Sequence, residues 1–569
     1  MGVDFRPPID DIAFVLEHVA GLADIASFPG LEQADLATTV GLLSEAGRFV
    51  AEVIAPLNVI GDIVGSRRNA DGTVTTPPGF AAAYRQYIEG GWGGISFPTS
   101  IGGGGFPWVV TIAVQELISA ANMGFSLCPL LTQGAIDLLL HHADEVQRET
   151  YLPKLVTGEW SGTMNLTEPD AGSDVGALRT KAVPADDGTY RISGTKIYIT
   201  YGEQDLSENI VHLVLARTPG APAGTKGISV FIVPKFLVRA DGTLGERNRL
   251  QCLKVERKLG IHASPTCVME FDDAVGYLIG DEGTGMRSMF TMMNNARLSV
   301  GLEGLAITER AYQQALAYAH DRRQGKAPGA TGQDSSPIVD HPDVQLLLAR
   351  MRAGTEGLRA LLYLDASCVD RASHHPDPAE RAKAADLVAL LTPTAKGFST
   401  DLGVELTSLG IQVHGGMGYV EETGAAQHWR DSRIAPIYEG TNGIQAIDLV
   451  TRKLGLGGGA VVAELLARVE ADAGATPALA ALRRSATWLG EALAAGRLAD
   501  TLAGATPFLR QFGLVLCDWL LQRMATVPGA PASKALVAEV WRTRFLPEAI
   551  GLEVAVTAGA AAPAALSAR

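Results

Sequence analysis

Apolar positions recur with a helical period along most of this chain. Residues 34–57 carry them on one face, and the pattern ends near Pro56, so we expect a helix there. The stretches 108–124 and 135–160 show the same period, and most of 8–90 is predicted to be helical. The first part of the chain is therefore expected to form a helical domain.

The period then changes to short β-branched runs that Gly, Pro and Asp turns separate. These runs predict strands and together an antiparallel sheet. They lie at 189–200, 209–218, 228–234 and 266–274.

The helical period returns at residue 285 and persists to the end of the chain. The Gly-, Pro- and Ser-rich stretch 324–340 is expected to be a surface loop, and the His-Pro pair at 341–342 is predicted to start the next helix. Another long helix is expected over about 378–410. After a glycine-rich linker, residues 461–569 are rich in Ala and Leu and predict further helices.

Composition and charge narrow the class of protein. Of 569 residues, 47 are Lys or Arg and 62 are Asp or Glu, which gives a net charge of −15 and argues against nucleic acid or an anionic membrane as the main partner. The cysteines are scattered without a C-x-x-C pair, and no His, Asp or Glu set has metal-ligand spacing, so no metal is expected. The start, MGVDFRPPID, has no apolar signal-peptide core, and we expect a soluble cytoplasmic protein.

Two segments far apart in the chain carry residues suited to chemistry. Residues 164–182 are turn-rich and place Ser173 among small residues whose backbone N–H groups can meet an anionic or heteroaromatic ligand, although an ordinary Ser turn explains the pattern equally well. In 433–445, Glu439 stands between an apolar run and Gly-Thr-Asn. A partly desolvated carboxylate there suits a general base, whereas a helix N-terminal carboxylate is the alternative.

Six ordered motifs resemble the acyl-CoA dehydrogenase family. The N-terminal piece PPIDDIAFVLEHV, the 324–340 loop and the C-terminal helices are further similar to the larger subfamily that includes 3-methylmercaptopropionyl-CoA dehydrogenase. The motifs are KIYITYGEQD (196–205), RKLGIHASPT (257–266), IGDEGTGM (279–286), NARLSVGLEGLAITERAYQQALAYAHDRR (295–323), QVHGGMGY (412–419) and IYEGTNGIQ (437–445).

The resemblance implies an α+β fold with an N-terminal helical domain, a middle antiparallel β domain, a C-terminal four-helix bundle and an extra C-terminal helical domain. The boundaries expected are an N-terminal extension at 1–40 and domains at 41–160, 161–275, 276–454 and 461–569.

The resemblance also implies FAD as cofactor, held between the sheet domain and the C-terminal helices. Tyr198 stands where the family has Trp, and Gly443 stands where it often has Gln; the segment DRRQGK is shorter than the family's equivalent. Arg322 matches an arginine that reaches the FAD pyrophosphate of a neighbouring subunit. The implied cofactor-binding residues are Met164, Leu166, Thr167, Gly172, Ser173, Tyr198, Thr200, Arg322, Gln412, Gly415, Gly416 and Thr441.

By the same resemblance, Glu439 is the base that removes the α-proton of an acyl-CoA thioester, while the β-hydrogen leaves as hydride to flavin N5. Arg297 would orient the region around the base. Short to medium acyl groups, or 3-methylmercaptopropionyl-CoA, are the implied substrates. The substrate-binding residues expected are Ser173, Met293, Asn294, Arg297 and Gly440.

The resemblance implies a homodimer that passes electrons to an electron-transfer flavoprotein. Two alternatives stay open at this point. One is an acyl-CoA oxidase that uses O₂. The other is a damage-response flavoprotein of the same fold that binds nucleic acid, which the scattered arginines of 461–569 disfavour because they form no basic stripe.

Overall fold

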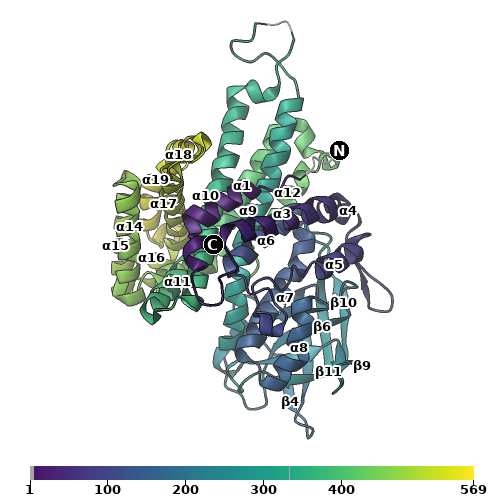
Figure 1. Ribbon diagram of the computed structural model, residues 1–569. Coiled ribbons are helices and arrows are strands. Elements are labelled where there is room, and N and C mark those ends of the chain that lie inside the picture. Colours follow the sequence, from purple (N-terminus) through teal and green to yellow (C-terminus); the bar gives the residue numbers. More distant parts are fainter. Residues whose placement is uncertain (1–4, 332–333, 569) are drawn as a thin grey trace. The chain divides into compact units, whose positions relative to one another are not determined.

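The computed structural model describes residues 5–331 and 334–568. The chain divides into two compact units, which are taken one at a time below. The sheet unit comprises residues 48–106 and 121–296, and the helical unit comprises residues 1–47, 107–120 and 297–569. Figure 1 follows the chain through both.

A seven-stranded sheet dominates the sheet unit, with the strand order β3-β6-β7-β11-β5-β4 and β10 paired to β11. Small two-stranded sheets, β1-β2 and β8-β9, accompany it. The strands are β1 (Arg67–Arg68), β2 (Val74–Thr75), β3 (Trp160–Asn165), β4 (Lys181–Pro184), β5 (Tyr190–Thr200), β6 (Asn209–Ala216), β7 (Ser229–Pro234), β8 (Phe236–Val238), β9 (Leu244–Arg247), β10 (Leu250–Val255) and β11 (Thr266–Leu278).

The sheet is mixed, so the prediction of a purely antiparallel sheet was wrong at one edge. Strand β3 runs parallel to β6, in the register Trp160↔Asn209 to Asn165↔Val214. The chain leaves β3 and passes through β4 and β5 before β6, and such a long crossover allows a parallel return. The sequence WSGTMN lacks the β-branched pattern of the other strands, which is why β3 was not predicted.

Helix α7 (Met123–His142) packs closely on β3. A side chain at Gly162 would meet the Ala135 methyl group at 2.3 Å, so only glycine permits this approach. The Thr132 hydroxyl accepts a hydrogen bond from the Gly162 N–H at 3.1 Å. The other helices that lie wholly in this unit are α4 (Leu57–Val64), α5 (Phe80–Glu89) and α8 (Glu145–Thr157).

Among the described residues, α7 is the one helix long and apolar enough by itself to pass as a membrane span. Of its apolar window, 89% is buried inside the protein, as expected for a core helix. The bent run Ala532–Ser567 passes the same test only if its two parts are counted together.

The helical unit is built on three long helices, α9 (Gly285–Asp321), α10 (Pro342–His374) and α11 (Pro378–His414). Helix α10 begins at Pro342 with His341 at its N-cap, as predicted, and the 324–331 part of the predicted loop carries no helix or strand. The remaining helices are α1 (Ile9–Val15), α2 (Leu22–Ile25), α3 (Leu36–Phe49), α6 (Trp108–Ala121), α12 (Ala425–Ser432), α13 (Asn442–Asp448), α14 (Ala460–Ala473), α15 (Pro477–Ala494), α16 (Leu498–Ala503), α17 (Ala505–Ala525), α18 (Ala532–Arg544), α19 (Leu546–Thr557) and α20 (Ala561–Ser567).

A buried ionic network joins α6, α9 and α10. Arg359 is 1% exposed, and its guanidinium donates to Glu116 and to Glu309 at 2.7 Å each. The Tyr363 hydroxyl donates to the second Glu116 oxygen at 2.7 Å. Because each buried charge has a partner, the network fixes the relative positions of the three helices.

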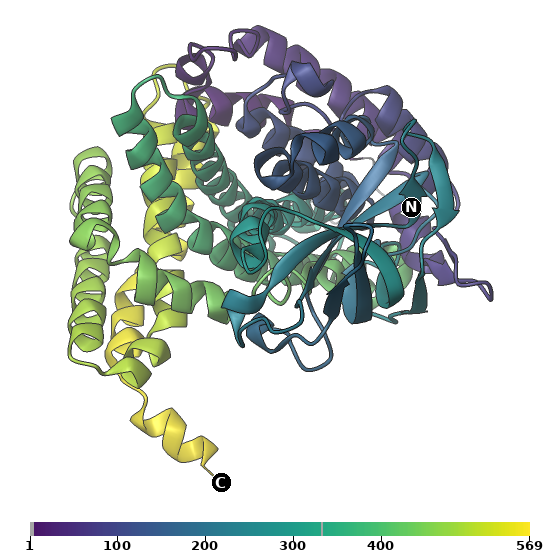
Figure 2. The same ribbon diagram turned by 90° about the horizontal axis from the view of Figure 1, so that it is seen from below.

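Of the C-terminal helices, drawn in green and yellow in Figure 2, α14, α17 and α18 pack on the long helices α10 and α11, and α15, α16 and α19 pack on α17. A side chain at Gly513 of α17 would meet the Phe398 ring of α11 at 2.3 Å, which shows how closely these helices approach. Buried Lys534 of α18 bonds to Glu356 of α10 at 2.9 Å and to Asp11 at 2.8 Å. The predicted helical C-terminal region is therefore confirmed, and it shares its core with the bundle.

Candidate active site

The segment that carries Glu439 is a tight turn between α12 and α13. Glu439 has φ +55° and Gly440 has φ +82°, so two successive residues adopt the left-handed conformation. The φ of position 440 favours glycine, and a side chain there would come within 2.8 Å of the Gln445 amide nitrogen and displace it. Thr441 then caps α13, its hydroxyl accepting from the Ile444 N–H at 3.2 Å.

Two buried side chains tie this turn to the middle of α11. The ammonium of Lys396, which is 0% exposed, donates to the Gly440 carbonyl at 2.9 Å and to the Asn442 side-chain oxygen at 2.8 Å. The Asn442 amide nitrogen in turn donates to the Thr400 hydroxyl at 2.9 Å and to Asp401 at 2.8 Å. The turn is thus held by a connected polar network.

The carboxyl of Glu439 is poised to exchange a proton near neutral pH. Burial raises the pKa of Glu439 to about 7, against the opposing effects of the Lys396 and Arg297 charges. Burial also lowers the pKa of Lys396 to about 8, although Glu439 and other nearby acids favour its charged form. Arg297 is half-buried, and Asp448 and Glu439 favour its charge against the effect of burial.

A second carboxyl, Glu303 of α9, lies in the same region. It is fully buried and accepts a short hydrogen bond from the Tyr438 hydroxyl. Burial raises the pKa of Glu303 to about 8, and the Glu439 charge acts in the same direction. Near neutral pH, Glu303 is therefore held mainly in its protonated form, which leaves Glu439 as the carboxyl that changes charge.

Sequence reasoning missed Glu303, Lys396 and Asn442. A usable signal existed, because Glu303 interrupts the apolar run SVGLEGLAI and Lys396 follows LLTPTA in a stretch otherwise free of charge. A charged residue inside an apolar helical stretch is seldom buried without a partner.

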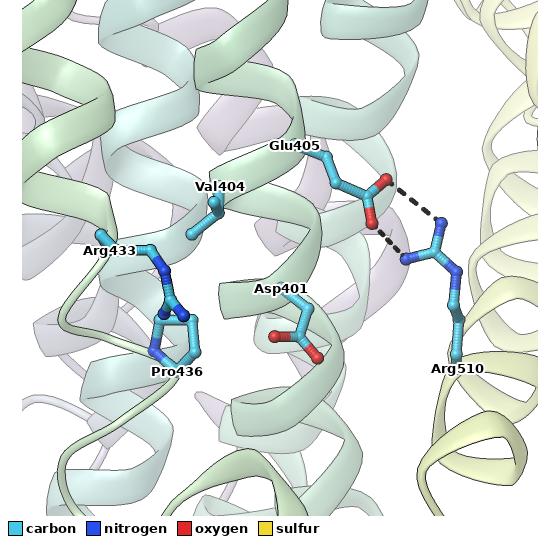
Figure 3. A pocket seen from close by; sticks show the side chains of 6 residues that line it. All are labelled: Asp401, Val404, Glu405, Arg433, Pro436 and Arg510. Atoms are coloured by element: carbon cyan, nitrogen blue, oxygen red, sulfur yellow. Dashed lines mark hydrogen bonds and ion pairs between the residues drawn. The ribbon is translucent and has the colours of Figure 1, made fainter.

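Figure 3 shows a pocket of about 280 Å³ beside the turn, on the helical unit. Asp401 lines it and also accepts from Asn442, so the pocket wall is continuous with the network that holds the turn. Arg510 of α17 closes one side and pairs with both oxygens of Glu405. Val404, Arg433 and Pro436 complete the lining.

In the sheet unit, the structure brings two predicted segments together. The Ile197 N–H donates to the Thr167 carbonyl at 2.9 Å, and buried Lys196 donates to the Leu166 carbonyl at 3.0 Å and to Glu168 at 2.8 Å. The stretch after β3 therefore lies against the end of β5. Met164, Leu166, Thr167, Tyr198 and Thr200 belong to this group.

These residues fit a flavin. Tyr198 is 61% exposed at φ +61°, so its ring is open to a ligand beside the half-buried Thr200. Gly172 and Ser173 are exposed, and a side chain at Gly172 would meet no atom within 4 Å. An open aromatic ring, two hydroxyls and uncovered backbone suit a planar heterocycle with polar edges.

The remaining predicted cofactor residues gather at one end of the helical unit. Tyr318 of α9 stacks on His414 of α11 with the ring centroids 4.4 Å apart, which sets the C-terminal ends of the two helices side by side. Arg322 follows α9 and is exposed, and its guanidinium makes no hydrogen bond or ion pair with other described residues. Gly415 and Gly416 follow α11, and Gln412 lies in its last turn. An exposed Arg beside uncovered glycine backbone suits a phosphate group.

Within one chain, this end of α11 does not meet the Glu439 turn. The rise of a helix places Gln412 about 24 Å along α11 from Lys396. Met293 and Asn294 lie on α9 about one turn before Arg297. The predicted site residues thus fall into three groups: the Glu439 turn with Thr441 and Arg297, the exposed end of α9 and α11, and the β3–β5 group of the sheet unit.

Four family models match the chain in order. They are "Acyl-CoA dehydrogenase, N-terminal domain" at residues 41–159, "Acyl-CoA dehydrogenase, middle domain" at 163–274, "Acyl-CoA dehydrogenase, C-terminal domain" at 283–454 and "Acetyl-CoA dehydrogenase C-terminal like" at 463–567.

The chain is also similar to individual proteins. It is 48% identical to 3-methylmercaptopropionyl-CoA dehydrogenase of Ruegeria pomeroyi over 557 residues, which cover 95% of this chain and 94% of that one. A chain in a structure of the electron transferring flavoprotein of Acidaminococcus fermentans is 26% identical with a TM-score of 0.60, over 72% of this chain and 96% of that one. An acyl-CoA dehydrogenase of Bacillus anthracis complexed with FAD shares the fold at 22% identity and a TM-score of 0.72, over 92% and 87% of the two chains.

Proposed function

This chain belongs to the acyl-CoA dehydrogenase family, and we propose that it oxidises an acyl-CoA thioester to the 2-enoyl-CoA with Glu439 as the α-proton base. The observation that carries this assignment is the Glu439 turn. A half-buried carboxyl whose pKa is raised to about 7 is held there in a strained, tethered conformation.

Glu439 accepts the α-proton of the substrate on its carboxylate. The backbone N–H of Glu439 makes no hydrogen bond to other described residues, so it is available to the thioester carbonyl oxygen, where negative charge develops. Arg297 stabilises the ionised base from α9. When FAD, the cofactor of the family, is bound, it would supply the hydride acceptor for the β-hydrogen.

The β3–β5 group of the sheet unit and Thr441 would hold the flavin end of the cofactor. The Thr441 hydroxyl accepts a bond within α13, which leaves its proton to donate to a ligand. Gln412 lies about 24 Å along α11 from Lys396, the residue that bonds to the Glu439 turn. This separation supports the proposal that Gln412, Gly415, Gly416 and the nearby Arg322 serve the FAD of a second subunit in a homodimer. We also propose the domain boundaries expected from sequence, with 461–569 as a packing domain.

The proposed substrate is a short or medium acyl-CoA, with 3-methylmercaptopropionyl-CoA as the leading candidate. The 48% identity to an enzyme of that name over nearly the whole chain supports this choice. An apolar pocket discriminates one methylene by only about 1–3 kcal/mol, and a thioether sulfur is close to a methylene in size and polarity. Selectivity should therefore fall gradually with chain length.

We propose an electron-transfer flavoprotein as the electron acceptor. The likeness to a chain in a structure of the electron transferring flavoprotein system supports it. We also propose a cytoplasmic enzyme that does not bind nucleic acid; the net charge of −15 supports the second part of this proposal.

The test is anaerobic bleaching of the flavin by butyryl-, hexanoyl-, octanoyl-, palmitoyl- and 3-methylmercaptopropionyl-CoA. Fastest reduction is expected with the short and medium substrates and with the thioether. Fastest reduction by palmitoyl-CoA would refute the proposed substrate class, and no reduction by any acyl-CoA would refute the activity. Rapid reoxidation of the reduced enzyme by O₂ without a protein acceptor would favour an oxidase.

A further inference from the structure

Lys396 is the least expected charge near the proposed base. It lies in the middle of α11, is 0% exposed, and directs its ammonium at the turn that carries Glu439. A lysine is seldom buried this deeply, because desolvation disfavours its charged form. Its two hydrogen bonds end on Gly440 and Asn442, the first and third residues after Glu439.

We propose that Lys396 is a positioning residue for the base: its ammonium holds the Glu439–Gly440 turn through the Gly440 carbonyl and its charge keeps Glu439 ionised. This inference rests on the proposed role of Glu439. It adds a residue on another helix, 43 positions earlier in the chain, that holds the turn in place and keeps the Glu439 carboxyl ionised.

The tether has a mechanical reason. Glu439 carries a side chain at φ +55°, a conformation that non-glycine residues adopt only when their surroundings impose it. The Lys396 bond to the Gly440 carbonyl holds the peptide that joins Gly440 to Thr441, one residue after Glu439. Without it, the turn is free to relax toward a right-handed conformation, and relaxation would move the carboxylate away from the substrate.

The charge has an electrostatic reason. Lys396 and Arg297 are the two cations whose charges act on the Glu439 carboxyl. Arg452 acts on Arg297, where it disfavours the charged form. The Lys396 charge opposes the effect of burial on the pKa of Glu439 more strongly than the Arg297 charge does, and Arg297 also interacts with Asp448. Glu303 of α9 and Tyr438 before the turn are the other ionisable groups that interact with Glu439. Asp401 of α11 acts on Lys396, and Asp448 of α13 acts on Arg297.

The experiment measures the rate of anaerobic flavin reduction against pH in the holoenzyme. Two variants are compared with the wild type. Lys396→Met removes the charge and the donors, and Lys396→Gln removes the charge but keeps an amide that can donate to the Gly440 carbonyl. Lys534→Met is the matched control, since it also deletes a buried lysine, in this case one that bonds to Glu356 and Asp11.

Loss of a nearby positive charge raises the pKa of a carboxyl. Both Lys396 variants should therefore move the apparent pKa of reduction upward by about one to three pH units, which slows reduction at pH 7 by about five- to 500-fold. At high pH, Lys396→Gln should recover more of the wild-type rate than Lys396→Met, because it keeps part of the tether. Lys534→Met should lower thermal stability and leave the pH profile in place.

A wild-type pH profile in whichever Lys396 variant retains FAD would overturn the inference. A Glu439→Gln variant measured in the same experiment distinguishes failure of the proposed base from failure of the proposed role of Lys396. If Glu439→Gln still reduces its flavin, the proposed base is wrong. If Glu439→Gln is inactive while the Lys396 variants titrate like the wild type, the base stands and the role of Lys396 is refuted.

Discussion

Gly440→Ala tests the geometry of the Glu439 turn most directly. The backbone at Gly440 has φ +82°, where a residue with a side chain costs about 1–2 kcal/mol. The new methyl group would also stand 2.8 Å from the Gln445 amide nitrogen, whose long bonds to the Glu439 and Gly440 carbonyls would be displaced. We expect a loss of about 1–3 kcal/mol in the free energy of unfolding.

The effect on catalysis should exceed the effect on stability. Displacing the turn moves the Glu439 carboxylate, and a shift of about 1 Å at a reacting group can cost about 100-fold in rate. The chain offers a matched control three residues further on. Gly443 lies in the first turn of α13, and a side chain there meets only the Thr441 hydroxyl oxygen at an ordinary 3.7 Å. Gly443→Ala should be neutral or stabilise by up to about 1 kcal/mol.

The assay pairs urea unfolding, followed by circular dichroism, with the anaerobic rate of flavin reduction. Gly440→Ala should lower both the unfolding midpoint and the rate, and Gly443→Ala should lower neither. Equal behaviour of the two alanine variants would show that the left-handed turn is not required, and the reasoning from its geometry would fail.

Three further predictions concern the proposed chemistry. Glu439→Gln should keep FAD and acyl-CoA but lose about 10²–10⁴-fold in the rate of flavin reduction, since the amide preserves shape and cannot accept a proton; near-normal reduction would place the base elsewhere. In the wild type, stopped-flow reduction should accelerate as pH rises through about 7, because the Glu439 carboxyl is protonated below that pKa and accepts the α-proton only above it; a rate that falls over this range would contradict the assignment. Arg322→Ala should weaken FAD retention and loosen self-association as measured by analytical ultracentrifugation; FAD loss with unchanged association would assign the contact to one chain.

The predicted elements followed from local patterns. The helical period placed α10 and α11, and the β-branched runs placed four strands of the sheet, because side-chain periodicity reflects which face of an element is buried. Strand β3 was not predicted, because its residues, WSGTMN, have no strand pattern and its partner β6 lies far along the chain. The sequence shows a glycine at position 440, but only the structure shows its left-handed φ of +82°.

What the sequence by itself determined is the long helices, four strands of the sheet, the acidic character of the chain and the motif around Glu439. The tertiary structure alone decided which distant groups act on that motif. Lys396 and Glu303 lie on other helices, and neither has a local pattern that points to position 439. Burial near one another nevertheless shifts the pKa values of Glu303, Lys396 and Glu439. The physical reason is that hydrophobic periodicity is read along the chain, whereas desolvation and charge pairing depend on what packing brings within a few ångströms.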